Sequence, residues 1–158
     1  PKYFLLENVI MKQESQDIIT EMLGVEPVMI NSSLVSAQNR QRLYWTNIPE
    51  ITKPEDKDLV LRDIIEDGFV DRDKSHCLDA NYFKGGNLKS YFEKHRRQLV
   101  FSDDGFTWRK LTPIECERLQ TVPDNYTAHV SNTQRYKMLG NGFTVDVIAH
   151  ILKGVIPC

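Results

Sequence analysis

Three short segments carry side chains that could recognise a heterocyclic base and a charged ligand. The first is Glu7-Asn8-Val9, which follows the apolar run at residues 3–6. Glu7 is therefore expected at the end of a strand, where open α/β sheets usually place their functional groups. A carboxyl group there could exchange hydrogen bonds with the edge of a heterocycle. A single Glu at a strand end is more often a cap or a surface acid, and that alternative stays open.

The second segment is Gln38-Asn39-Arg40-Gln41-Arg42. The two arginines have a spacing of two, so both side chains point to one face if the segment is extended. Guanidinium groups on one face suit the recognition of phosphate or carbonyl oxygens. The alternative is a pair of surface arginines that brace nearby acids.

The third segment, Gly140-Asn141-Gly142, separates two amphipathic stretches. The free N–H groups at the start of the following helix would favour an oxygen-rich ligand. Asn141 offers both a donor and an acceptor to such a ligand. The alternative is a plain turn between helices, in which Gly supplies left-handed backbone.

The elements expected around the first two segments form an α/β layer. The run at 3–6 is typical of an interior strand covered on both faces. A helix follows, with Ile18, Ile19, Met22 and Leu23 on one face and Gly24 as its stop. Further strands are expected at 27–30 and 43–48. A strand, helix, strand series of this length predicts a βαβ-type layer.

Residues 49–108 are rich in Pro and Gly and predict a loop-rich insert with short helices near 59–65 and 90–98. Regular structure then returns. Thr112-Pro113-Ile114-Glu115 is a capping box with proline at the first helical position. Two more helices are expected, one at 132–139 and one that begins near Thr144 and ends at Gly154.

The 158 residues carry a formal net charge of −2, which conceals an uneven distribution. Residues 50–73 contain nine acids and four bases, whereas residues 84–98 contain five bases and one acid. The basic stretch could attract phosphate, or both stretches could be solvated loops. The three cysteines are far apart, which predicts neither a metal site nor a disulfide framework and favours a cytoplasmic setting. No segment reads as a membrane span or a signal peptide.

Four motifs in this order resemble the second half of a DNA cytosine-5 methyltransferase. Residues 4–9 look like the ENV motif and residues 36–44 like the QxRxR motif. Residues 109–120 resemble the helix that closes the target-recognition region, and Gly140-Asn141-Gly142 resembles the final motif. The resemblance implies an α/β fold in which residues 1–48 and 133–158 are the C-terminal portion of a Rossmann-like catalytic domain. Residues 49–132 would be a small target-recognition region.

The resemblance also implies roles for individual residues in DNA methylation, the reaction of restriction-modification methyltransferases. Glu7 would contact the ring nitrogen and amino group of a cytosine flipped out of double-stranded DNA, and Arg42 its carbonyl oxygen. Arg40 would belong to the same catalytic group, chiefly by organising the loop. The cofactor S-adenosylmethionine would be held by Asn141, Gly142 and Phe143. The DNA contacts would come from Lys84, Gly85, Gly86, Lys89, Arg96, Arg97 and Thr112.

Departures from the family pattern are as informative as the matches. The family's nucleophile is a Cys in a Pro-Cys motif ahead of ENV, and none of Cys77, Cys116 and Cys158 fits it. The Gly-rich cofactor loop is also absent, and Gly142 replaces the common Ser. We therefore expect a fragment or subunit that is inactive without an N-terminal half or complementary subunit, and that self-associates through its first strand. The alternatives are a catalytically dead, DNA-binding or regulatory protein of this fold, and an unrelated α/β binding domain.

Overall fold

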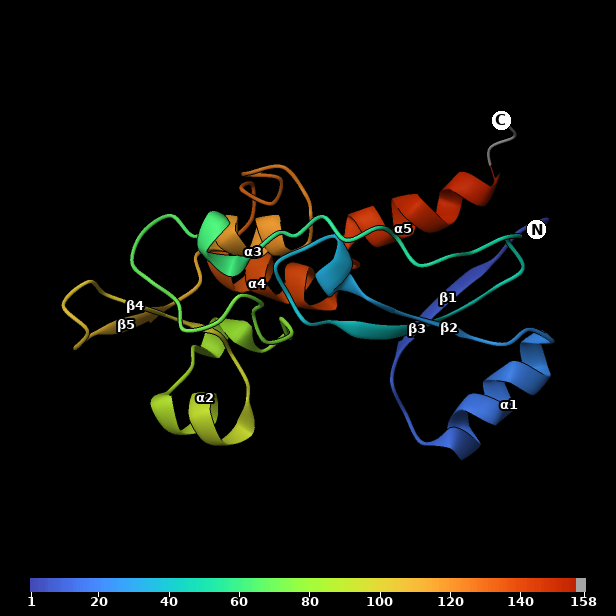
Figure 1. Cartoon of the computed structure of the whole chain (residues 1–158), viewed down its shortest axis with the longest axis horizontal. Helices are drawn as coiled ribbons and strands as arrows, with labels where there is room; N and C mark the ends of the chain where they lie inside the picture. The colour runs from blue at the N-terminus through green and yellow to red at the C-terminus, as the bar shows by residue number, and fades with distance from the viewer. Residues whose placement is uncertain (156–158) are drawn as a thin grey trace.

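A three-stranded sheet forms one lobe of the protein in a computed structural model, which describes residues 1–155 (Figure 1). The strands are β1 (Leu5–Val9), β2 (Val28–Asn31) and β3 (Gln41–Thr46), in the order β1-β3-β2. Both outer strands pair antiparallel with β3. Strands β1 and β2 thus run in the same direction and are joined by helix α1 (Gln13–Leu23), as a βαβ unit requires. The predicted layer needs one correction, because β3 lies between them.

Helices cover the two faces of this sheet. Side chains alternate along β3, so Tyr44 and Trp45 point to opposite faces. Trp45 donates from Nε1 to Thr20 Oγ1 of α1 at 2.9 Å. Tyr44 packs in a core with Val147 of helix α5 (Val145–Leu152). Figure 1 accordingly shows α1 and α5 on opposite sides of the strands.

Helix α1 ends as predicted at Gly24, whose φ of 68° is left-handed. Its predicted apolar face is less covered than expected. None of its residues is buried, and Ile18 and Met22 are 59% and 81% exposed. An amphipathic helix gains most of its stability from burying its apolar face. Because little of that face is covered, α1 gains little stability from burial in this chain.

Strand β1 differs from the prediction in two ways. It was expected as an interior strand at residues 3–6 that ends at Glu7. It is an edge strand, paired only with β3 in the described residues, and Glu7 lies at its centre. Leu6 and Val9 are 38% and 51% exposed. An exposed apolar edge favours pairing with another chain, and self-association through this strand stays a prediction.

The second lobe is built from short elements around its own core. Helix α2 (Leu88–Lys94), the hairpin of β4 (Leu99–Phe101) and β5 (Trp108–Lys110), and helices α3 (Pro113–Leu119) and α4 (Asn132–Asn141) make up the lobe. Three-residue 3-10 turns complete it at Leu61–Asp63 and Tyr82–Lys84, while two more, Ser32–Leu34 and Lys153–Val155, belong to the first lobe. The core is apolar, with Leu61, Leu78, Tyr82, Val100, Leu111, Cys116, Leu119, Tyr136 and Leu139 among its buried residues. The helix predicted at 59–65 is therefore only a turn, and the helix predicted at 90–98 is α2.

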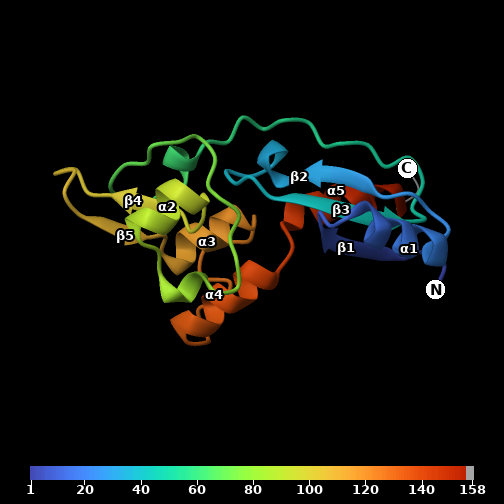
Figure 2. The same ribbon diagram turned by 90° about the horizontal axis from the view of Figure 1, so that it is seen from below.

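The chain passes between the lobes at Gly142. Tyr136 and Leu139 of α4 are buried in the core of the second lobe, whereas Val147 of α5 is buried against the sheet. Figure 2 shows α4 below the second lobe and α5 along the strands of the first. The turn between α4 and α5 therefore lies where the two lobes meet.

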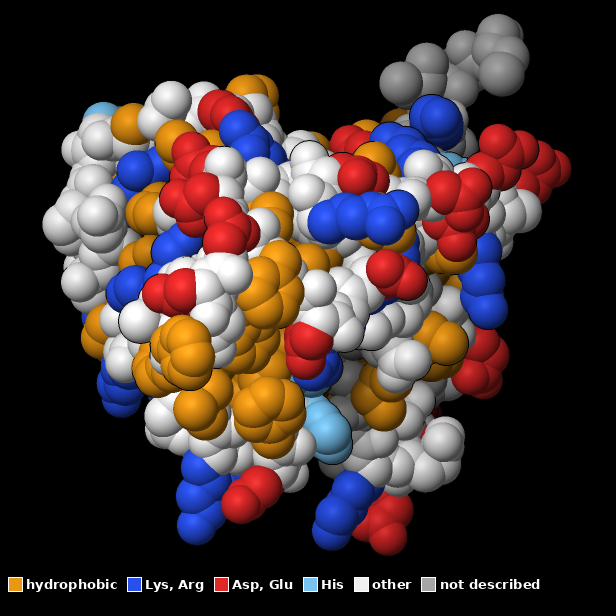
Figure 3. Space-filling view, turned by 60° about the vertical axis from the view of Figure 1, so that its left-hand side comes forward, with side chains coloured by type: hydrophobic (Ala, Val, Ile, Leu, Met, Phe, Trp, Pro, Cys, Tyr) orange, Lys and Arg blue, Asp and Glu red, His pale blue; other side chains and the backbone are white. Residues whose placement is uncertain are grey.

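A cluster of aromatic rings reaches the surface of the second lobe, with two rings half-exposed and Tyr91 buried beneath them. Phe69 stacks on Phe101 at 5.6 Å, and Tyr91 contacts Phe101 and Phe92 at 6.0 and 5.1 Å between centroids. Phe69 and Phe92 are 45% and 56% exposed. Figure 3 shows hydrophobic side chains gathered on this face, beside a histidine. Aromatic rings at these separations stabilise one another beyond the area they bury.

His76 beside these rings makes stability depend on pH. Burial, then the charges of Arg72 and His95, lower the pKa of His76 from 6.5 to about 4, against the opposing effect of Asp71. The unfolded chain therefore binds a proton between pH 6.5 and about 4 that the folded chain does not. We expect the free energy of unfolding to be highest above pH 6.5 and to decrease as the pH is lowered from 6.5 to about 4.

Urea unfolding at several pH values measures this, with His76→Gln as the control. Its amide oxygen can still accept from Arg72, whose Nη1 lies 2.7 Å from His76 Nε2. The variant should lose stability less steeply between pH 6.5 and 4. Identical slopes for the two proteins would contradict the assignment to His76.

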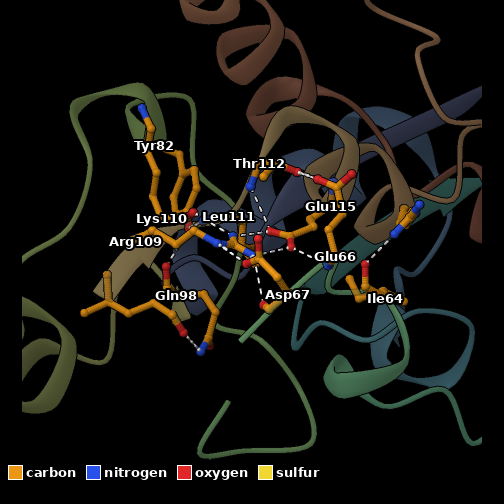
Figure 4. Close-up of polar contacts among 12 residues, drawn as sticks. Ile64, Glu66, Asp67, Tyr82, Gln98, Arg109, Lys110, Leu111, Thr112 and Glu115 are labelled. Atoms are coloured by element: carbon orange, nitrogen blue, oxygen red, sulfur yellow. Dashed lines mark hydrogen bonds and ion pairs between the residues drawn. The ribbon is translucent and has the colours of Figure 1, made fainter. Parts of the chain in front are cut away.

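The predicted capping box opens α3 and also completes a buried ion pair. Glu115 N donates to Thr112 Oγ1 at 3.1 Å, and Thr112 N donates to Glu115 Oε2 at 2.8 Å. Arg109 donates from both terminal nitrogens to the buried Glu115 carboxylate at 2.8 Å, and it also binds Asp67 (Figure 4). The hydrogen bond to Glu115 is the main cause of a raised Arg109 pKa. This network ties the hairpin to the start of α3.

Candidate active site

Glu7 and Arg42 form an ion pair on one face of the sheet. Glu7 pairs with Tyr44 and Val9 with Arg42 across β1 and β3, so Glu7 and Arg42 are diagonal neighbours on the same face. Arg42 Nε lies 2.9 Å from Glu7 Oε1, and the two side chains are 14% and 16% exposed. The pair is therefore largely, but not fully, shielded from water.

Arg40, two residues earlier, is committed to backbone carbonyls. Its side chain is buried, with Nη1 donating to Leu78 O at 2.9 Å. Nη2 donates to Gly142 O at 2.9 Å and to Gly140 O at 3.3 Å. These contacts join the start of β3 to the second lobe and to the interhelical turn. Arg40 was predicted in the catalytic group chiefly as the residue that organises the loop, and its buried guanidinium contacts three backbone carbonyl oxygens.

Cys77 also lies in this cluster, although the sequence motifs place it in the variable insert. Arg40 Nη1 is 3.4 Å and Arg42 Nη2 is 3.7 Å from Cys77 Sγ, and the thiol contacts Leu78 O at 3.6 Å. Cys77 is 35 residues from Arg42 along the chain. No local pattern could have paired them, so sequence reasoning missed this residue.

Tyr44 lies next to the ion pair, directly across from Glu7 in the pairing of β1 with β3. Its side chain is buried, and burial, followed by the nearby charge of Glu7, raises the Tyr44 pKa to about 12. The phenol therefore stays protonated at neutral pH. The spacing of two between Arg40, which precedes β3, and Arg42 and Tyr44 within it is the sequence signal that could have identified Tyr44.

The Gly-Asn-Gly segment is not a left-handed turn. Asn141 is the last residue of α4, and its cap Gly142 has a φ of −71°. Gly140 is required for close packing, because a Cβ there would lie 2.3–2.4 Å from backbone atoms of Asp79 and Ala80. The segment leaves Asn141 exposed and Phe143 48% exposed at the junction of the lobes.

The start of α5 also differs from the prediction. Val145 N donates to Gln120 O at 3.0 Å, and Asp146 N donates to Thr121 Oγ1 at 2.9 Å. The Thr144 hydroxyl binds Gln120 Oε1 at 3.0 Å. The prediction of free N–H groups for an anionic ligand was therefore wrong, since internal acceptors occupy them.

Two buried glutamine side chains connect these parts. Gln38 Nε2 donates to Leu119 O at 2.7 Å and to Gln120 Oε1 at 3.0 Å. Gln120 Nε2 in turn lies 3.3 Å from Gly142 O. Amide groups that are buried and mutually satisfied hold a unique arrangement. Both residues stand within the four motifs, but their role follows only from these contacts.

The basic segment at 84–97 supplies fewer open charges than its composition suggests. Lys84 and Lys89 are exposed. Arg96 Nη2 lies 3.5 Å from Asp79 Oδ2, and Arg97 Nη1 donates to Gly85 O at 2.8 Å. Arg97 is therefore engaged inside the protein. Lys94 is exposed as well, so three lysines and the half-exposed Arg96 are the basic side chains of this segment that remain available to phosphate.

The other predicted DNA contacts have internal roles as well. Gly85 has a φ of 73°, which favours glycine, and a Cβ on Gly86 would lie 2.9 Å from the Leu99 side chain. Thr112 caps α3 and donates its hydroxyl to Glu66 Oε2 at 2.6 Å. These residues thus have roles in backbone conformation, packing and capping, and their contacts with DNA stay a prediction.

Within residues 1–155, no helix is long and apolar enough to cross a membrane. The same described residues contain no group of three or more His, Cys, Asp or Glu side chains arranged to hold a metal ion. The site is therefore described by its carboxylate, guanidinium, thiol and amide groups.

The profile of the C-5 cytosine-specific DNA methylase family matches residues 71–156. The chain belongs to this family. It is 30% identical to the type II methyltransferase M2.ScrFI of Lactococcus lactis subsp. cremoris, across 97% of this chain and 54% of that protein. It is 33% identical to M.SsoII of Shigella sonnei, across 52% of this chain and 19% of that protein. The chain thus spans about half the length of M2.ScrFI and a smaller share of M.SsoII.

Solved methyltransferase structures share the fold. The Entamoeba histolytica methyltransferase EhMeth superposes with a TM-score of 0.66 at 15% identity, covering 99% of this chain and 64% of that one. A putative DNA modification methyltransferase encoded within an E. coli prophage gives 0.59 at 20% identity, with 98% and 69% covered. At these identities the likeness concerns the mixed α/β fold, and it extends over both lobes.

Proposed function

We propose that this chain is the C-terminal part of a DNA (cytosine-5-)-methyltransferase, which holds the flipped target cytosine and one side of S-adenosylmethionine. The observation that carries the proposal is the Glu7–Arg42 pair, with Asn141 brought to the same junction by the contacts of Arg40 to Gly140 and Gly142. Three segments distant in the sequence thus converge on one partly shielded place. We further propose that the sheet and α5 belong to a Rossmann-like catalytic domain, with residues 49–132 as the target-recognition region.

Glu7 and Arg42 would recognise the base by complementary hydrogen bonds. A carboxyl group suits the ring nitrogen and amino group of cytosine, and a guanidinium suits its carbonyl oxygen. In the free chain the two side chains satisfy each other at 2.9 Å. The base would take over part of this pairing, which keeps both groups partnered before and after binding. Glu7 would hold a proton at the ring nitrogen during attack on the ring.

Asn141, Gly142 and Phe143 fit the edge of a cofactor site. Asn141 presents its amide outward from the end of α4, and the half-exposed Phe143 ring lies beside it. S-adenosylmethionine, when bound, supplies the methyl group. Because the first N–H groups of α5 already have acceptors, the polar recognition here would come from the Asn141 side chain and not from the helix terminus.

The test is methyl transfer with and without an N-terminal half. We expect the chain alone to transfer no labelled methyl group to DNA, because none of its cysteines lies in a Pro-Cys motif ahead of Glu7. Adding an N-terminal methyltransferase half that carries the Pro-Cys motif and the Gly-rich loop should give activity; this mixture is called the restored enzyme. Transfer by the chain alone would contradict the proposal. A mixture that binds DNA yet transfers nothing would favour a catalytically dead binding protein.

The contribution of the basic segment to DNA binding is tested by salt titration. Replacing Lys84 and Lys89 with Ala should weaken binding of the restored enzyme to all DNA sequences alike. The slope of log K against log salt should fall by about 0.9 for each phosphate that the protein no longer neutralises. Lys2→Ala, outside the insert, is the control. An unchanged slope would show that the two lysines form only a solvated surface.

A further inference from the structure

We propose that the thiol of Cys77 is a positioning group for the base site, which couples the target-recognition region to the orientation of Arg42. The inference rests on the proposed function of Glu7 and Arg42 as the groups that hold cytosine. It adds a residue that lies in the insert, outside the four motifs, and gives that residue a task at the site. Cys77 itself would not react with the base.

The geometry places the sulfur between two guanidinium groups. Cys77 Sγ lies 3.4 Å from Arg40 Nη1 and 3.7 Å from Arg42 Nη2, and the thiol hydrogen can point to Leu78 O at 3.6 Å. The sulfur lone pairs are then left to face the two arginines. Sulfur is a weak and polarizable acceptor that tolerates such long contacts.

The side chains of Arg40 and Arg42 differ in conformational freedom. This difference is the reason why the contact of the Cys77 thiol with both of them can position Arg42. Arg40 is held in place by three carbonyl oxygens and is buried. Arg42 is partly exposed, and its long side chain can adopt many rotamers. Restricting it to one of them costs conformational entropy. Its Nη1 donates to Gln41 O at 2.8 Å, its Nε faces Glu7, and Nη2 faces the thiol. The thiol contacts both the fixed Arg40 guanidinium and Nη2 of Arg42. It therefore restricts the part of the Arg42 guanidinium that Glu7 does not contact.

The bridge also connects the two lobes. Cys77 precedes Leu78, which is buried in the core of the second lobe, and Ser75 is paired with Ala37 and Asn39 by backbone hydrogen bonds. A shift of this segment would move the sulfur away from Arg42 and free the guanidinium to leave Glu7. Correct seating of the recognition region would therefore orient the base site, which is a direct route from target choice to catalysis.

Substituting Cys77 separates positioning from folding. In the restored enzyme, Cys77→Ala should lower kcat on the order of tenfold with little change in KM for DNA, because misplacement of a catalytic partner affects the reacting geometry. Cys77→Ser keeps an acceptor, although its shorter C–O bond draws that acceptor back, so it should recover part of the rate. His76→Gln is the matched control, because His76 is next to Cys77 but its ring contacts Arg72 and not Arg40 or Arg42; it should leave kcat unchanged.

A second readout uses the chain alone and does not depend on activity. The Arg42 Nη2–H resonance, from the nitrogen that faces the thiol, should be protected from solvent exchange in the wild type, weakened in Cys77→Ser and lost in Cys77→Ala, at unchanged urea midpoints. Persistence of that resonance in Cys77→Ala would overturn the inference, as would a wild-type kcat. If Cys77→Ala does not fold, an unaltered resonance in Cys77→Ser decides against it. An inactive wild-type mixture would refute the proposed function, while the resonance would still decide the role of Cys77.

Discussion

Glu7→Gln is expected to slow methyl transfer by the restored enzyme about a hundredfold or more, the usual weight of a general acid. The substitution keeps the shape of the side chain and its ability to hydrogen bond, but it removes the charge that pairs with Arg42 at 2.9 Å. It also removes a group that can hold a proton at the ring nitrogen. Single-turnover transfer of labelled methyl groups measures the effect on the chemical step.

The control for this experiment is Glu21→Gln, an exposed residue of α1, which should leave the rate unchanged. The urea midpoint of the Glu7→Gln chain should stay close to that of the wild type, because the pair is only partly buried. A rate near that of the wild type would remove Glu7 from the mechanism. A large loss of stability would instead make Glu7 a structural residue.

Arg40→Met should lower the free energy of unfolding by about 3 kcal/mol, because a buried acceptor left without its donor costs about 1–3 kcal/mol. The buried guanidinium serves Leu78, Gly140 and Gly142. Methionine fills much of the volume but donates to none of these carbonyl oxygens. Urea unfolding of the chain alone provides the measurement, and no DNA or cofactor is needed.

Arg42→Met is the matched control, because Arg42 lies two residues after Arg40, near the start of β3. It is partly exposed and its main partner is Glu7, so its loss should cost about 1 kcal/mol or less. In the restored enzyme the order should reverse, with Arg42→Met reducing transfer by more than its stability explains. Equal destabilisation by the two substitutions would contradict the division into a positioning and a base-binding arginine.

The sequence alone was sufficient wherever the determining interactions are local. The capping box joins Thr112 and Glu115, which are three positions apart, and the observed hydrogen bonds confirm it. Gly24 ends α1 because its left-handed backbone is a property of that one residue. The family followed from four ordered motifs, and the profile match confirms it. In each case the signal lies within a few consecutive residues or in their order.

Tertiary structure decided what depends on residues far apart in the chain. The periodicity of residues 1–48 predicted strands and a helix, but it contained no information that β3 would lie between β1 and β2 and put Glu7 at mid-strand. Gly140 read as a turn residue, whereas it is needed because α4 packs against Asp79. Arg40 reaches carbonyls up to 102 residues away.

The same reason explains Cys77, which meets Arg42 across 35 residues. Periodicity and capping report the backbone's own hydrogen bonds and which face of an element is apolar. They do not report which polar side chains two packed lobes bring into contact, since that depends on how the cores of both lobes fill. The sequence therefore determined the family, the end of α1, the start of α3 and the candidate groups, whereas packing of the lobes decided which of those groups meet.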